Sequence, residues 1–90
     1  MKNNPAIRHH LRVDTDAGRV WEKEGRRGCP PGTELGFLKD TGQVMLTFYG
    51  SKYFRSHIVV FMVHGKWPRS VTHKNGVRHD DSIENLRIHW

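Results

Sequence analysis

The chain has 90 residues, and its 15 lysines and arginines outnumber nine acidic residues, which gives a net charge of +6. A chain of this length forms one small domain with a thin core, because it buries only about 60–65% of the surface that its unfolded form exposes. The longest apolar run is far too short to cross a bilayer, and the single cysteine, Cys29, excludes an internal disulfide and a cysteine-based zinc cluster. The first residues show no signal-peptide pattern, so we expect a cytoplasmic protein without membrane contacts.

The first third of the chain is rich in turn signals. Residues 1–12 are predicted to form an amino-terminal arm, either loose or with a short helical turn, and residues 13–90 to form the single domain. The sequence DTDAG at 14–18 predicts a tight turn, since Asp side chains bond to nearby backbone and glycine tolerates positive φ. A short strand is expected at 19–21, and the glycine- and proline-rich residues 25–32 predict a loop.

The middle of the chain predicts a hairpin region followed by one helix. Three strands are expected, at residues 34–38, 43–49 and 52–55, with turns at 40–42 and 50–51. Ser56 is a suitable N-cap for a helix at 57–64, and Gly65 is a suitable residue to end it. Because this helix is rich in β-branched residues, we expect packing to hold it rather than intrinsic propensity. The sequence therefore predicts an α+β fold with a small antiparallel β-hairpin region and one central helix.

The most informative segment is VTHKNGVRHDDSIENLRIHW, at residues 71–90. His73 follows an extended apolar approach, an Asn-Gly turn comes directly after it, and an Asp-rich loop leads to Asn85. This order predicts an extended segment at 71–73, a loop, a turn at 82–85 and a final strand. It suits a histidine held by a loop whose turn is tied together by the asparagine.

From residue 13 onward the chain resembles the small phage and intron-associated HNH homing endonucleases. The resemblance rests on four stretches that occur in one order: DTDAGRVW, GFLKDTGQVMLTFYGSKY, HIVVFMVHGKWP and THKNGVRHDDSIENLR. It covers nearly the whole chain, which makes it more specific than any single stretch. It implies a phage-type protein with DNA as partner, and a ββα-metal finger whose degenerate HNH motif occupies residues 70–90.

The resemblance also implies roles for individual residues of the finger. His73 corresponds to the general base, and Asn85, twelve residues later, to the asparagine that orients the histidine loop. Thr72 stands where the family has a metal ligand, and a neutral hydroxyl is a weak ligand for a hard cation. The sequence given ends at Trp90 within the second strand, so the finger is expected to lack its final, metal-binding helix. His73 is therefore expected to be a remnant of the base in a catalytically inactive site.

Other residues of this region are expected to have structural roles. No metal ligand and no cofactor are predicted, and a divalent metal such as Mg²⁺ enters only if the chain is an active nuclease. His79 and His89 are interpreted as exposed histidines, and Asp80 and Asp81 as caps of the turn at 82–85. His57, at the start of the helix, is interpreted as structural, bonding within the core or to the loop.

The basic residues are spread along the chain and predict contacts with a nucleic-acid backbone. The candidates are Arg26, Arg27, Lys52, Arg55, Lys66, Arg69, Lys74, Arg78 and Arg87. Three functions remain open. The first is an HNH-endonuclease-like DNA-binding protein without catalysis. The second is a phage-encoded inhibitor that binds a host enzyme such as a CRISPR effector, a restriction system or RNA polymerase, and the third is an active, metal-dependent HNH nickase.

Overall fold

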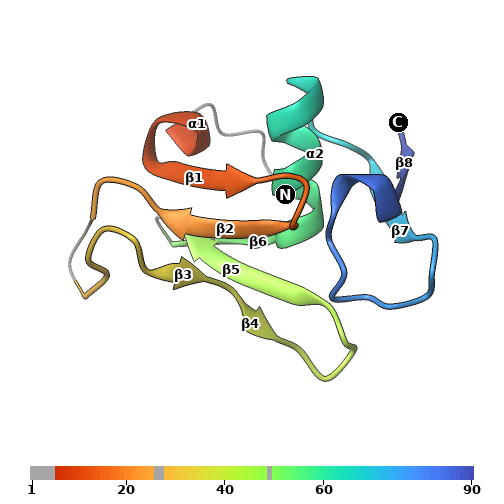
Figure 1. Ribbon diagram of the computed structural model, residues 1–90, viewed down its shortest axis with the longest axis horizontal. Coiled ribbons are helices and arrows are strands. Elements are labelled where there is room, and N and C mark those ends of the chain that lie inside the picture. The colour runs from red at the N-terminus through yellow and green to blue at the C-terminus, as the bar shows by residue number, and fades with distance from the viewer. Residues whose placement is uncertain (1–5, 26–27, 49) are drawn as a thin grey trace.

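The computed structural model describes residues 6–25, 28–48 and 50–90 of the chain. Two three-stranded antiparallel sheets and one β-hairpin surround the ten-residue helix α2 (Arg55–His64). This helix contacts strands of all three, and in Figure 1 it lies between the carboxyl-terminal hairpin and the two larger sheets. The predicted α+β fold, with antiparallel hairpins and one central helix, is confirmed. No described helix is both long enough and apolar enough to span a bilayer.

The strands are short, and all of their pairings are antiparallel. The first sheet joins β1 (Leu11–Asp14), β2 (Arg19–Glu22) and β3 (Glu34–Leu35) in that order. The second joins β4 (Phe37–Leu38), β5 (Val44–Phe48) and β6 (Ser51–Phe54). The hairpin pairs β7 (Ser70–His73) with β8 (Leu86–His89), and we refer to residues 70–89 as the finger. The short helices α1 (Ala6–His10) and η1 (Ile83–Asn85) precede β1 and β8.

The amino-terminal residues take part in the core. Ile7 of α1 and Leu11 of β1 are buried and pack in the main hydrophobic cluster. Of the two conformations predicted for residues 1–12, residues 6–10 adopt the short helical turn. Strand β1 is not among the predicted elements. The two apolar residues are separated by polar ones, which leaves too few positions to reveal a periodic pattern.

The strand predicted at 34–38 is wrong, because Gly36 divides it into β3 and β4. Gly36 has a φ of 125°, and a Cβ atom on it would lie 2.8 Å from Cγ1 of Val44. The glycine lets the chain leave the first sheet and enter the second within one residue. The loop predicted at 25–32 falls partly on residues 26–27, which lie outside the described residues.

Helix α2 is held by packing on both of its sides. Ile58 and Phe61 join the main cluster, whereas Val59 and Val60 pack with Leu86 of the finger. The predicted C-terminal glycine is confirmed: Gly65 has a φ of 72° and its N–H donates to the carbonyl of Phe61.

The predicted N-cap of α2 is wrong. The helix begins at Arg55, two residues before the predicted start at residue 57, and Ser56 is buried inside its first turn. The cap position is occupied by Phe54, which makes no side-chain hydrogen bond to the helix. This shift places Arg55 in the first turn, where its side chain reaches the finger.

The register of the β7–β8 pairing determines which face of the finger packs on α2. Val71 pairs with Ile88 and His73 pairs with Leu86, and neighbouring cross-strand residues share one face of a hairpin. Val71, Leu86 and Ile88 pack in the cluster of Val59 and Val60. The histidine is therefore carried on the inner face, and Thr72 is carried on the outer face.

The β1–β2 turn packs against the finger from the other side. Oδ1 of Asp14 accepts hydrogen bonds from the N–H groups of Asp16 and Ala17, as the sequence predicted for this turn. The carbonyl of Thr15 accepts a hydrogen bond from the N–H of Ile83 at 2.9 Å. Gly18 has a φ of 69°, and a Cβ atom on it would lie 2.3 Å from the carbonyl carbon of Asp81. The turn and the finger fit together only because residue 18 has no side chain.

We expect the substitution Gly18→Ala to lower the free energy of unfolding by more than about 2 kcal/mol, since it combines left-handed strain with a backbone clash. Urea denaturation followed by tryptophan fluorescence measures this. Gly32→Ala is the matched control, because Gly32 also has a positive φ of 85° but no atom lies within 4 Å of the added carbon. Equal losses in the two variants would show that the close approach at Gly18 contributes nothing.

Candidate functional site

His73 ends strand β7 and lies inside the junction between the finger and α2. Its side chain is only 6% exposed, and its Nε2 lies 2.7 Å from Oδ1 of Asp81. The residue also lines a hollow of about 480 Å³, together with Gln43, Thr72 and Arg78. One ring nitrogen of the candidate base is therefore held by a buried carboxylate.

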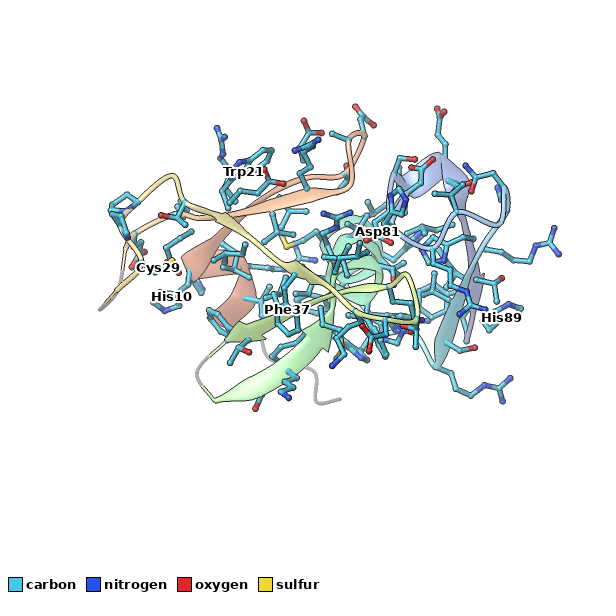
Figure 2. All side chains as sticks on the ribbon, turned by 90° about the horizontal axis from the view of Figure 1, so that it is seen from below. His10, Trp21, Cys29, Phe37, Asp81 and His89 are labelled. Carbon is cyan, nitrogen blue, oxygen red and sulfur yellow. The ribbon has the colours of Figure 1, made fainter. Side chains whose placement is uncertain are left out.

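Asp81 bonds two side chains at once. Its second oxygen, Oδ2, accepts a hydrogen bond from Nε of Arg55 at 2.8 Å, and the Arg55 side chain is 12% exposed. An Nη atom of Arg55 also donates to the carbonyl of His79 at 2.7 Å. Figure 2 shows Asp81 at the junction of the finger with the rest of the domain. The prediction that Asp81 caps the turn at 82–85 is wrong, because its carboxylate points to His73 and Arg55.

Asp80 behaves as predicted for a turn residue. Its Oδ1 accepts hydrogen bonds from the hydroxyl and the N–H of Ser82, and its Oδ2 accepts one from Nδ2 of Asn75. The bond from the Ser82 hydroxyl is the main reason that the pKa of Asp80 is lowered from its ordinary value. Both oxygens of this carboxylate are thus occupied by bonds within the loop.

Asn85 ties the loop that follows His73. Its Oδ1 accepts a hydrogen bond from the N–H of Asn75, and its Nδ2 donates to Oδ1 of Asn75 and to the carbonyl of Asp80. The backbone N–H of Lys74 donates to the carbonyl of Asn85. Asn85 thus joins the start of the loop between β7 and η1, at Asn75, to its later part, at Asp80.

The residues around His73 do not fit a divalent cation. Thr72 is exposed on the outer face, and its Oγ1 lies 3.3 Å from Nε2 of His89. A hard cation prefers several oxygen ligands, with carboxylates among them. Both nearby carboxylates, those of Asp80 and Asp81, are already occupied by internal donors. Among the described side chains, no three of histidine, cysteine, aspartate or glutamate gather as a metal site.

His89 lies on the far side of the finger from Asp81, as Figure 2 shows. His89 is half-buried, and its Nε2 is paired with Oγ1 of Thr72. The interpretation of His89 as an exposed histidine is therefore wrong. His79 is exposed, as expected, and contributes its backbone carbonyl to Arg55.

His57 is structural but makes no hydrogen bond through Nδ1. This atom is buried and has no partner among the described residues. The ring packs between Phe54 and Trp67 instead, with centroid distances of 5.3 and 5.8 Å. Burial lowers the pKa of His57, and the charge of Asp81 acts in the opposite direction. Its neutral ring therefore belongs to the packing of α2.

The predicted phosphate-binding residues that the structure describes are exposed, with the exception of Arg55. The exposed group consists of Lys52, Lys66, Arg69, Lys74, Arg78 and Arg87. Arg78 also donates to the carbonyl of Thr41 at 3.0 Å, which joins the finger loop to the β4–β5 turn. Arg55 is directed inward to Asp81, and Arg26 and Arg27 lie outside the described residues.

The sequence does not predict the pairing of Arg55 with Asp81, although it assigns each residue another role. They are 26 residues apart, and nothing in either local pattern points to the other. Only the docking of the finger on the first turn of α2 brings them together. The Asp-rich loop was a usable signal, but it indicated caps as readily as an ion pair.

We expect Arg55→Ala to lower the free energy of unfolding by about 3 kcal/mol, because it leaves a buried carboxylate without its cation. Thermal and urea unfolding measure the loss. Arg19→Ala is the control, since Arg19 pairs with Glu34 on the exposed surface and such pairs contribute less than about 1 kcal/mol. Equal losses from both variants would contradict a buried ion pair at Asp81.

Comparisons with known proteins agree with this architecture. A family model described as HNH endonuclease matches residues 53–88, which contain α2 and nearly the whole finger. A solved structure titled "DNA binding and cleavage by the HNH homing endonuclease I-HmuI" matches with a TM-score of 0.60 and 19% sequence identity. The match covers 97% of this chain but 50% of that chain, so the present sequence spans about half of the larger protein. No curated protein matches it significantly. Residues 53–88 are thus similar to the HNH endonuclease family, and the chain shares its fold with part of that homing endonuclease.

Proposed function

We propose that this chain binds DNA through the basic surface of its finger and does not cleave it. The observation that carries the proposal is the group of exposed cations on and beside the finger. Arg69 precedes β7, Lys74 follows it, and Arg87 lies on the outer face of β8, opposite Thr72. Such side chains attract the phosphates of a duplex without reading its bases.

The fold likeness supports DNA as the partner class. The matched solved structure is described as binding and cleaving DNA, and the likeness of fold extends over 97% of this chain. The net charge of +6 has the sign that a polyanion requires. The apolar face of the finger is buried against α2, which leaves its polar, basic face for a ligand.

The donor set around His73 argues against cleavage by these residues. Metal-assisted hydrolysis of a phosphodiester uses the cation to stabilise the developing negative charge. Here Thr72 offers a neutral hydroxyl, and Asp81 is neutralised by Arg55. General-base assistance alone contributes about 10²–10⁴-fold, far less than the reaction needs.

A metal-dependent nickase is the second candidate, and one observation favours it. Nε2 of His73 is bonded to Asp81, which is the arrangement expected of an oriented base. The loop beyond it is also tied by Asn85.

Salt-dependent gel-shift titrations test DNA binding. We expect the triple substitution Arg69→Ala, Lys74→Ala and Arg87→Ala to weaken binding to any duplex. It should reduce the slope of log affinity against log salt by about 0.9 for each lost phosphate contact. The matched control removes three cations on and beside the first sheet, through Arg12→Ala, Arg19→Ala and Lys23→Ala. Identical losses in both variants would show that only the total charge matters, and salt-independent binding would refute the proposal.

Incubation of supercoiled plasmid with Mg²⁺ or Mn²⁺ tests the absence of cleavage. We expect the plasmid to remain supercoiled with the wild-type chain and with His73→Ala, since both carboxylates near His73 are held by internal donors. Nicking by the wild type that His73→Ala abolishes would overturn this part of the proposal and establish the nickase. Nicking that survives in His73→Ala would indicate a contaminating nuclease, which a further purification step removes before the comparison is repeated.

A further inference from the structure

The hydrogen bond between His73 and Asp81 determines which nitrogen of the imidazole carries the proton. An ionised carboxylate can only accept hydrogen bonds, so the Nε2 that lies 2.7 Å from Oδ1 must be the donor. In a neutral ring with its hydrogen on Nε2, the lone pair is on Nδ1. No described residue bonds Nδ1, and the ring borders the hollow that Thr72 and Arg78 also line.

We infer that Asp81 is the positioning residue of His73, which fixes the Nε2–H tautomer and leaves Nδ1 as the basic nitrogen. This goes beyond DNA binding, because it concerns the state of the histidine and holds whether or not the chain binds a duplex.

Arg55 determines which oxygen of Asp81 remains for His73. A guanidinium has only hydrogen-bond donors. Nε of Arg55 donates to Oδ2 of Asp81, so Oδ1 remains for His73. The backbone of Asp81 is held in turn by the β1–β2 turn, where Gly18 packs against it and Thr15 accepts the N–H of Ile83. The carboxylate can therefore neither rotate freely nor withdraw from the ring.

The other titratable groups near the ring do not compete for Nε2. Asp80 is bonded to Ser82 and Asn75, and the buried His57 ring packs against Phe54 and Trp67. The tautomer is thus decided by one contact, which makes it accessible to a single substitution.

Asp81→Asn is the decisive variant. Because Arg55 still only donates, the amide oxygen will face Arg55 and the amide NH₂ will face His73. Nε2 must then accept, and the ring must move its hydrogen to Nδ1. Such an exchange can preserve geometry while reversing the tautomer, as known for oriented histidine–aspartate pairs.

Long-range ¹H–¹⁵N correlation spectra of the ring nitrogens read the tautomer directly, at a pH where the imidazole is neutral. The His73 signals are assigned by their loss in His73→Gln. We expect a hydrogen on Nε2 in the wild type and on Nδ1 in Asp81→Asn. The control Asp80→Asn, the same change one residue away, should keep the wild-type tautomer.

The inference is overturned by a wild-type ring with its hydrogen on Nδ1, or by an Asp81→Asn ring that keeps it on Nε2 in a folded protein. Backbone amide spectra show whether each variant is folded. If Asp81→Asn does not fold, the wild-type spectrum still decides the assignment, and Arg55→Gln, whose amide can still donate to Asp81, should retain the Nε2–H form. Failure of DNA binding in the gel-shift titrations leaves these spectra unaffected, so the two proposals fail independently.

Discussion

The buried carboxylate of Asp81 is the point at which three separately formed parts of the domain meet. His73 arrives from the finger, Arg55 from the first turn of α2, and Gly18 of the β1–β2 turn packs on the backbone beside it. Burying a carboxylate without partners costs several kcal/mol, so the packing of the finger and the presence of both donors depend on one another. A two-stranded hairpin with four residues in each strand is marginal by itself, and the finger is therefore stable only while it is docked.

Apolar and polar contacts make different contributions to the packing of the finger on α2. Val71, Leu86 and Ile88 bury the inner face of the hairpin against Val59 and Val60, and this burial stabilises the contact without fixing its register. The hydrogen bonds of His73 and Asn85 fix the register, because a slip of one residue would turn the histidine to the outer face. The same alternation places Thr72 and Arg87 outward, so the positioned histidine and the basic surface follow from one pairing of strands.

The parts of the fold that could be predicted from the sequence are those that local chemistry determines. The turn at 14–18, the end of α2 at Gly65 and the histidine–loop–asparagine order of the finger each have a signal within a few residues. The change of sheet at Gly36 and the ion pair of Arg55 with Asp81 have none, because they arise when distant segments pack. At Ser56 a local signal is present but misleading. Serine is a good N-cap, yet tertiary packing buries Ser56 inside the first turn of the helix.

The ion pair also affects whether a divalent cation could bind beside a histidine that is arranged like a general base. A divalent cation beside His73 would need an anionic ligand, and the carboxylate that bonds the ring already has Arg55 as its positive partner. The cation would have to displace a guanidinium that is bound both to Asp81 and to the carbonyl of His79, or else bind through the neutral hydroxyl of Thr72. The first route is costly, because removing one partner from a buried pair leaves the other charge uncompensated. The second route offers the cation only a weak, neutral ligand. Arg55 is thus the cation of this site: its charge is paired with the carboxylate that holds His73, whereas Arg87 and its basic neighbours on the outer face are exposed.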